Sequence, residues 1–152
     1  AMGDSDTRNL IERLLESQVQ CVLATGGPQG PAAHLMAYGY TAGLSRLFIA
    51  SRPGTAKVAN MRERPAVALL WDNRTGNLED HREGAVLTAG ASARELSGAE
   101  AGEARAHLLA RNPNLDALLK TPDTAVFELA VVQYSIGIGY ADHHIYTPAT
   151  GA

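Results

Sequence analysis

The sequence predicts a mainly β (α+β) fold, an antiparallel barrel of six strands with flanking helices. Short runs of apolar and β-branched residues recur along the chain, and Gly- and Pro-rich turns separate most of them. Short loops between the predicted strands imply antiparallel pairing, and the helices are inserted between such strands. This arrangement does not fit βαβ units, in which a helix connects two parallel strands. With 152 residues, 45% of them hydrophobic and 19% charged, the chain is expected to be one domain over 1–152, with tails at 1–6 and 141–152.

The first half of the chain predicts a helix followed by a three-stranded meander. Residues 7–18 place their leucines and isoleucine on one stripe opposite Arg and Glu, and Asp4, Ser5 or Asp6 is available as the N-cap. The turns GGPQGP and TAG are short, so the strands that they join should pair antiparallel. These strands are expected at 19–25, 32–40 and 44–51.

The second half predicts three more strands with helices between them. Ser97 and Glu100 fit a capping box, Gly90 suggests a β-bulge, and the last strand should bend near Gly137 or Gly139. The polar tail is expected to lie over the surface or over a partner subunit. The strands are expected at 66–72, 85–95 and 125–140, and the helices at 55–63, 98–111 and 115–120.

Composition excludes several classes of function. Thirteen basic and sixteen acidic residues give a net charge of −3 without a long block of either sign, so no nucleic-acid partner is expected. No apolar run reaches 18 residues and the N-terminus lacks the regions of a signal peptide, so we expect no membrane partner and a cytoplasmic protein. Cys21 is the only cysteine, which excludes an intramolecular disulfide.

The stretch SRPGTAKVANM, residues 51–61, predicts a phosphate site. Pro53 and Gly54 turn the chain into a helix whose unpaired N–H groups and partial positive charge favour an anion. One of only two lysines, Lys57, lies in the first helical turn, where its charge has the wrong sign for the helix dipole. Thr55 adds a hydroxyl and Arg52 a guanidinium, so a phosphate dianion would satisfy all of these groups. The alternative is a solvated lysine and a simple helix cap.

The order of segments around this stretch resembles the pyridoxamine 5′-phosphate oxidase-like family. The resemblance rests on a helix, the CVLAT strand, a G-x-P turn and strand, the LFIASR strand end, the T-x-K-x-x-N helix and the RPAVALL strand, over residues 8–72 and more weakly through 140. It implies a split β-barrel that binds FMN in a cleft between the two subunits of a homodimer.

The resemblance also implies which residues hold the cofactor. Ser51, Arg52, Thr55 and Lys57 would bind the FMN phosphate, and Asn60 would support that turn. The residues that would flank the isoalloxazine ring are Leu35, Met36, Ala37, Tyr38 and Ala50. Two departures argue against vitamin B6 oxidation. Ala56 replaces the first residue of the Arg-Lys pair typical of the oxidases, and the tail IYTPATGA lacks their substrate-binding Trp and Arg.

Other side chains carry weaker predictions. Trp71 either offers a flat face to the flavin ring or is a residue of the core. His34 fits a hydrogen bond to flavin or substrate, or a structural role. His143 and His144 invite a metal or haem interpretation, but adjacent residues of an extended chain point to opposite faces. Asp80 and His81 read as solvated. No nucleophile–base pair or metal motif stands out, so no catalytic side chain and no metal ligand is predicted.

Three hypotheses follow. The first is an FMN-dependent oxidoreductase that acts on a small-molecule substrate at the dimer interface, where the cofactor carries the redox chemistry. The alternative is a non-catalytic protein that binds FMN, the deazaflavin F420 or haem. The third is a dimeric structural barrel with an empty cleft. Neither the substrate nor the electron donor follows from the sequence.

Overall fold

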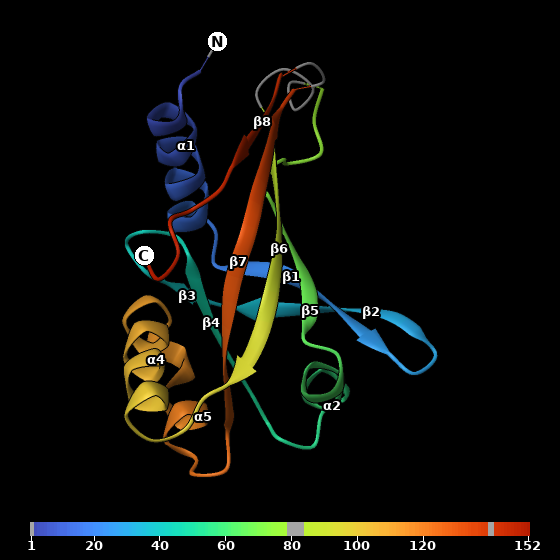
Figure 1. Ribbon diagram of the computed structural model, residues 1–152, viewed down its shortest axis with the longest axis vertical. Helices are drawn as coiled ribbons and strands as arrows, with labels where there is room; N and C mark the ends of the chain where they lie inside the picture. The colour runs from blue at the N-terminus through green and yellow to red at the C-terminus, as the bar shows by residue number, and fades with distance from the viewer. Residues whose placement is uncertain (1, 79–83, 140–141) are drawn as a thin grey trace.

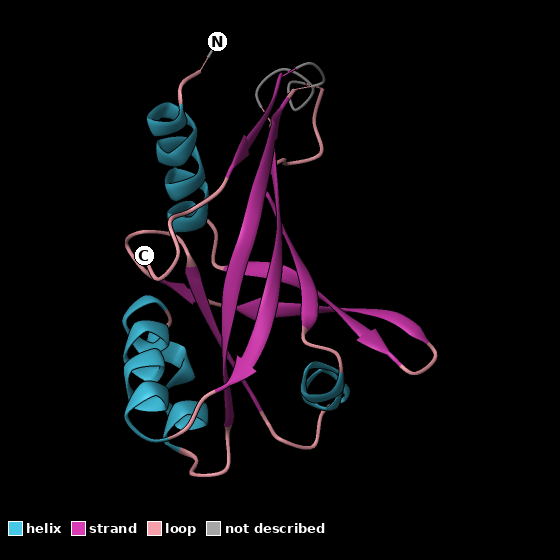
Figure 2. Cartoon of the chain, viewed as in Figure 1, coloured by secondary structure: helices cyan, strands magenta, loops and turns pink. Residues whose placement is uncertain are grey.

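The computed structural model describes residues 2–78, 84–139 and 142–152. These residues form one curled antiparallel sheet with helices around it (Figures 1 and 2). The strands are β1 (Gln20–Gly27), β2 (Gly30–Ala37), β3 (Gly39–Tyr40), β4 (Arg46–Ser51), β5 (Ala66–Asp72), β6 (Ala85–Glu95), β7 (Ala125–Ile138) and β8 (Asp142–Tyr146). The helices are α1 (Asp4–Ser17), α2 (Ala56–Glu63), α4 (Gly98–Arg111), the 3₁₀ turn η1 (Pro113–Leu115) and α5 (Asp116–Lys120).

The strand order explains how the sheet curls into a barrel. Neighbouring strands follow the order β2-β1-β5-β6-β7-β4-β3, and β8 pairs with β7 outside this path. β2 and β3 stand at the two ends of the order, yet only Tyr38 separates them in the chain. The two ends of the sheet are therefore joined covalently at this residue, and every pairing is antiparallel. The predicted antiparallel split barrel with flanking helices is confirmed.

The main core fills the inside of this curl, under α1. Alternate residues of the strands point inwards because successive side chains of a strand face opposite sides. Trp71 packs edge-on against Tyr38 at a centroid distance of 5.7 Å and lies 6.5 Å from Tyr134. Ile11, Leu14 and Leu15 of α1 close the core from one side.

A second, smaller core lies between the helices α4 and α5 and the opposite face of β4 and β7. Phe48 and Val126 come from the strands, and Ala104, Leu108 and Leu119 from the helices. Figure 1 shows α4 and α5 on one side of the barrel and α2 on the other. The two faces of β4 are thus both covered, which accounts for its nearly continuous apolar run.

Several predicted boundaries match the structure. β5, β6 and α4 have the predicted bounds, and the register of β6 against β7 shifts between Gly90 and Ala91, where a bulge was expected. Ser97 is the N-cap of α4 but makes no side-chain cap bond, and Glu100 pairs with Arg94, so the predicted capping box does not form.

Three expectations were wrong. The described residues contain eight strands instead of six, because the expected strand at 32–40 breaks into β2 and β3 and the tail forms β8. The N-cap of α1 is Gly3, so Asp4 already lies inside the helix. The last strand ends at Ile138, and the chain reverses through Gly139, whose φ of +60° suits glycine. Among the described residues, no helix combines the length and apolarity needed to span a membrane.

Candidate functional site

The turn between β4 and α2 brings together the hydroxyls that were predicted to bind phosphate. Ser51 Oγ lies 3.1 Å from Thr55 Oγ1, and the two hydroxyls donate to the carbonyl oxygen of Arg52 at 3.3 and 3.1 Å. Thr55 is the N-cap of α2 with an extended backbone, but its side chain makes no bond to the helix. The N–H groups of the first turn of α2 are therefore not consumed by a side-chain cap and remain donors for a ligand.

Lys57 adds a full positive charge at the same helix end. It is half-buried, and the first turn of α2 contains no acidic residue. Within the described part of the chain, Lys57 makes no ion pair and no hydrogen bond through its side chain. Its charge therefore adds to the positive end of the helix dipole without a carboxylate to offset it, and this favours a bound anion.

A chain of hydrogen bonds connects α2 to the strands β1 and β2. Asn60 Nδ2 donates to Thr25 Oγ1 at 3.0 Å, and Thr25 Oγ1 lies 3.0 Å from His34 Nε2. Asn60 and Thr25 are buried, so their polar groups need these partners. The sequence predicted that Asn60 supports the phosphate turn. In the structure its side-chain amide joins α2, the helix that follows this turn, to β1.

His34 lies beside this network and close to Lys57. Burial lowers the pKa of its imidazole below the ordinary value, and the positive charge of Lys57 lowers it further. The neutral ring is therefore favoured near neutral pH, and its Nε2 can accept a hydrogen bond from the Thr25 hydroxyl. Thr25 was not predicted as a site residue. The signal for it was a polar residue at an inward position of β1, in the alternation Cys21, Leu23, Thr25.

The Arg52 side chain lies on a different side of the turn from Lys57. It is exposed and lines a separate pocket of about 560 Å³ together with Pro53, Asn114 and Asp123, on the side of the turn that faces α5. Lys57, by contrast, acts on His34 of β2. The turn thus carries one cation on each side, and the phosphate prediction is best carried by Lys57 with Ser51 and Thr55.

The residues predicted to flank the ring separate onto the two faces of β2. Leu35 is 65% exposed and Ala37 is partly exposed, whereas Met36 and Tyr38 point into the main core. The Tyr38 hydroxyl donates to the carbonyl oxygens of Leu15 and Gln18. A planar ligand along β2 would therefore contact the side chains of Leu35 and Ala37. It would contact only the backbone of Met36 and Tyr38.

Trp71 and Ala50 lie in the two cores. Trp71 is 1% exposed, and its Nε1 has no hydrogen-bond partner among the described residues. Ala50 belongs to the second core, under α4 and α5. Neither side chain offers a surface to a ligand of this subunit, so the core interpretation of Trp71 fits its position.

The remaining candidates do not converge on a second reactive site. Burial raises the pKa of the Cys21 thiol to about 12, so it is not a nucleophile in the folded state. His143 Nε2 lies 2.7 Å from Ser135 Oγ, and His144 is on the other face of β8. No group of metal-binding side chains occurs in the described residues. Asp80 and His81 lie outside the described residues.

Comparison with known proteins identifies the family. Residues 8–135 match the sequence model of the pyridoxamine 5′-phosphate oxidase family. The chain belongs to this family. The match includes β1 through most of β7, and hence the turn with Ser51, Thr55 and Lys57. No curated protein matches the chain in sequence.

Solved structures with the same fold include two that are named as haem proteins and a third, ChuZ. The haem-binding protein from Mycobacterium smegmatis has a TM-score of 0.77 at 21% identity, over 88% of this chain and 55% of its own. ChuZ from Campylobacter jejuni has a TM-score of 0.79 at 12% identity, over 100% and 64%. HutZ, the haem storage protein from Vibrio cholerae, has a TM-score of 0.70 at 16% identity, over 94% and 95%. This chain therefore spans less than two thirds of the first two proteins, and at these identities the likeness shows the fold alone.

Proposed function

We propose that this protein binds FMN, with the phosphate at the turn between β4 and α2, and that it is a flavin-dependent oxidoreductase acting on a small molecule. The observation that carries the proposal is the unpaired Lys57 at the start of α2, beside two hydroxyls and free helix N–H groups. A phosphate dianion would provide acceptors for the helix N–H groups and a negative charge for Lys57, and the two hydroxyls, which now donate to the carbonyl oxygen of Arg52, would rotate to donate to it. The residues present therefore fit the phosphate end of the cofactor.

The isoalloxazine ring would lie along the exposed side of β2. Leu35 and Ala37 supply apolar contact there, and the backbone of β2 supplies hydrogen-bonding groups along its free edge, because β2 pairs only with β1. When bound, FMN would supply the hydride or electron transfer that this chain's side chains do not provide. His34, on the other face of β2 from Leu35 and close to Lys57, would be a neutral imidazole near the phosphate end of the cofactor.

The proposal includes a homodimer that covers this side of β2. The outward residues of β2, β1, β5 and β6 form two uncharged rows in register, and an uncharged, partly apolar sheet face is typical of an interface. One row is Leu35, Val22, Leu70 and Thr88, and the other is Ala33, Ala24, Ala68 and Gly90. A second subunit on this face would shield both Leu35 and the ring from water.

A titration with FMN tests the proposal. Wild-type protein should quench flavin fluorescence saturably and melt at a higher temperature with FMN. Lys57→Ala should weaken FMN binding by about 1–3 kcal/mol, the size of a charge-assisted hydrogen bond. The matched control is Lys120→Ala, which removes the only other lysine, 75% exposed and paired with Asp116 at 2.8 Å. An equal affinity in wild type and Lys57→Ala would place the phosphate elsewhere.

The second candidate is haem binding, which is favoured by two structural neighbours that are named as haem proteins. His34, which is partly exposed, and His143, which is exposed on β8, are imidazoles that a haem iron could use. A titration with hemin separates the candidates. A saturable Soret band together with no response to FMN would replace the flavin proposal with a haem-binding one.

A further inference from the structure

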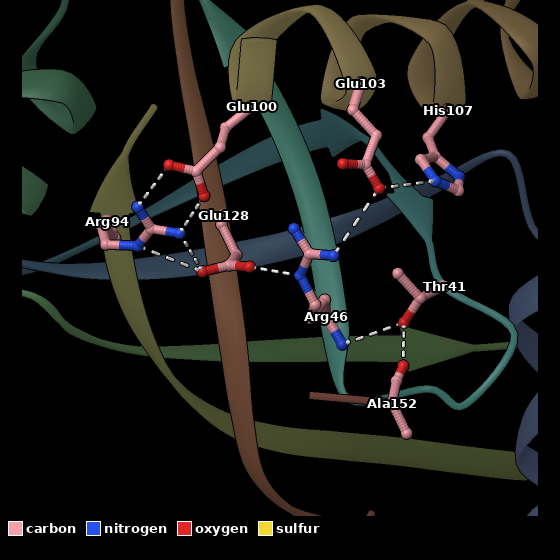
Figure 3. Close-up of polar contacts among 8 residues, drawn as sticks. All are labelled: Thr41, Arg46, Arg94, Glu100, Glu103, His107, Glu128 and Ala152. Carbon is pink, nitrogen blue, oxygen red and sulfur yellow. Dashed lines mark hydrogen bonds and ion pairs between the residues drawn. The ribbon is translucent and has the colours of Figure 1, made fainter. Parts of the chain in front are cut away.

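A second pocket lies at the opposite end of β4 from the phosphate turn. It has a volume of about 790 Å³, within the range of small-molecule sites, and it is bounded by β4, β6, β7, α4 and the C-terminal segment 147–151. Arg46 opens β4 at this pocket, whereas Ser51 closes β4 at the phosphate turn. Figure 3 shows the charged side chains that line it, which are Arg46, Arg94, Glu100, Glu103 and Glu128.

Part of this wall is a completed ion-pair network. Glu128 is 8% exposed and accepts from Arg46 Nε and from Arg94 Nη2, the latter at 3.1 Å. Arg94 also donates to both carboxylate oxygens of Glu100, at 3.3 and 2.8 Å. These bonds join β4, β6 and β7 to α4, so Glu128, Arg94 and Glu100 have their partners and serve the fold.

Three groups at the same pocket are left without close partners. The terminal nitrogens of Arg46 make no hydrogen bond among the described residues, and a carboxylate oxygen of Glu103 lies 3.8 Å from Nη1, beyond hydrogen-bond distance. The other contact of that Glu103 oxygen is His107 Nε2 at 3.9 Å, also beyond a hydrogen bond (Figure 3). Ser45 lines the pocket, is 4% exposed, and has no partner for its Oγ in the described part of the chain.

A buried hydroxyl without a partner is costly, and beside it the edge of the Arg46 guanidinium and the half-exposed Glu103 carboxylate keep hydrogen-bonding capacity that no described protein group uses. Their complement is a molecule with an acidic group and an amino group on neighbouring atoms. A guanidinium presents parallel N–H groups that fit a carboxylate. A glutamate accepts hydrogen bonds from an ammonium group.

We propose that this pocket binds a free α-amino acid. The carboxylate of the amino acid would accept hydrogen bonds from the terminal nitrogens of Arg46 and from the Ser45 hydroxyl. Its ammonium group would donate to the Glu103 carboxylate. Val131, Val132 and Pro148 line the pocket beside these groups, so an aliphatic side chain fits better than a charged one. This site is separate from the proposed flavin site and does not depend on it.

The charge of the pocket decides against a simple anion. Three glutamates and two arginines line it, so its net charge is −1. Phosphate or sulfate at Arg46 would be repelled by Glu103, whereas a zwitterion brings its own positive group to that carboxylate.

Calorimetric titration of the purified protein with L-leucine tests the proposal. Two compounds of the same shape serve as probes of each group, 4-methylpentanoic acid without the amine and 3-methylbutylamine without the carboxylate. L-leucine should bind saturably, and each analogue should bind at least about tenfold more weakly, because each leaves one charged partner unpaired. Absence of leucine binding, or equal binding of an analogue, would overturn the proposal.

Variants then locate the binding. Glu103→Gln changes an exposed carboxylate outside the Glu128 network, so it should keep the fold and weaken leucine binding about tenfold. Ser45→Ala should weaken it as well. The matched control is Asp116→Asn, which alters a surface acid that pairs with Lys120. Unchanged affinity in Glu103→Gln, with an unchanged melting temperature, would also overturn the proposal.

Discussion

Arg111 and Tyr38 share their hydrogen-bond acceptors. Arg111 Nη2 donates to the carbonyl oxygens of Leu15 and Gln18 at 3.0 and 2.8 Å, and the Tyr38 hydroxyl donates to the same two oxygens. The guanidinium also lies 4.6 Å from the centre of the Tyr38 ring. One pair of side chains thus joins the end of α1, the end of α4 and the residue between β2 and β3 at which the barrel closes.

Arg111→Ala should therefore destabilise the fold. The variant loses a cation–π contact and two charge-assisted hydrogen bonds in a half-buried place, which together amount to about 2–3 kcal/mol of unfolding free energy. Denaturant unfolding followed by circular dichroism measures it. The control is Arg62→Ala, which removes an exposed arginine paired with Glu95 and should leave the midpoint nearly unchanged. Equal midpoints for the two variants would contradict the role given to Arg111.

The pKa of His34 should report on the charge of Lys57. Because burial and then Lys57 lower this pKa, Lys57→Ala should raise it towards the ordinary value of 6.5. NMR titration of the imidazole protons measures the change, and His34→Gln assigns the signal among the five histidines. Bound FMN should raise the same pKa, because a phosphate dianion offsets the lysine charge. An identical titration in wild type and Lys57→Ala would mean that the two side chains do not interact.

The same shift predicts how stability depends on pH. A histidine with a lowered pKa in the folded state binds fewer protons folded than unfolded, so the folded state loses stability as pH falls below the unfolded pKa of about 6.5. The loss ends once pH is below the folded pKa. His34→Gln should remove this component, which melting curves of both proteins between neutral and mildly acidic pH would detect.

Trp71 should matter for folding and not for flavin binding. Its indole is 1% exposed between Tyr38 and Tyr134, so Trp71→Ala should cost about 3–5 kcal/mol of stability. Trp71→Phe keeps most of the volume and removes an N–H that has no partner among the described residues, so it should cost much less. FMN titration of Trp71→Phe should give the wild-type affinity. A clear loss of affinity would restore the ring contact that the sequence suggested.

The sequence predicted those parts of the fold that depend on local pattern. β6 and α4 were predicted with their bounds, because strand alternation, a polar break after Glu95 and the helical period after Ser97 are all local signals. β8 was missed because DHHIY is polar, and its strand conformation depends on pairing with β7. The break at Tyr38 follows from barrel closure, which no local pattern encodes.

The same distinction holds for the candidate site. Ser51, Thr55 and Lys57 lie within seven residues, so the turn between strand and helix could be recognised from sequence. The contact from Asn60 to Thr25 spans 35 residues, and it exists because α2 packs against β1. The placement of Arg52 towards α5 likewise depends on a helix more than 60 residues later in the chain.

The final prediction concerns the uncharged face of the sheet. Leu70 lies in the middle of the row that also contains Val22 and Leu35, and it is 38% exposed. If a second subunit covers this face, Leu70→Asp would bury an unpaired carboxylate in the interface, which costs far more than its exposure to water. Analytical ultracentrifugation should then show a dimer for wild type and a monomer for Leu70→Asp, and FMN binding should weaken together with the dimer.

Leu109→Asp is the matched control for this change. Leu109 has nearly the same exposure, 37%, but lies on α4, away from the uncharged rows. The control should remain dimeric and keep its affinity for FMN, because the new carboxylate is exposed to water in the monomer and in the dimer. A wild-type monomer that binds FMN, or dissociation of both variants to the same extent, would show that this face is not where two subunits meet.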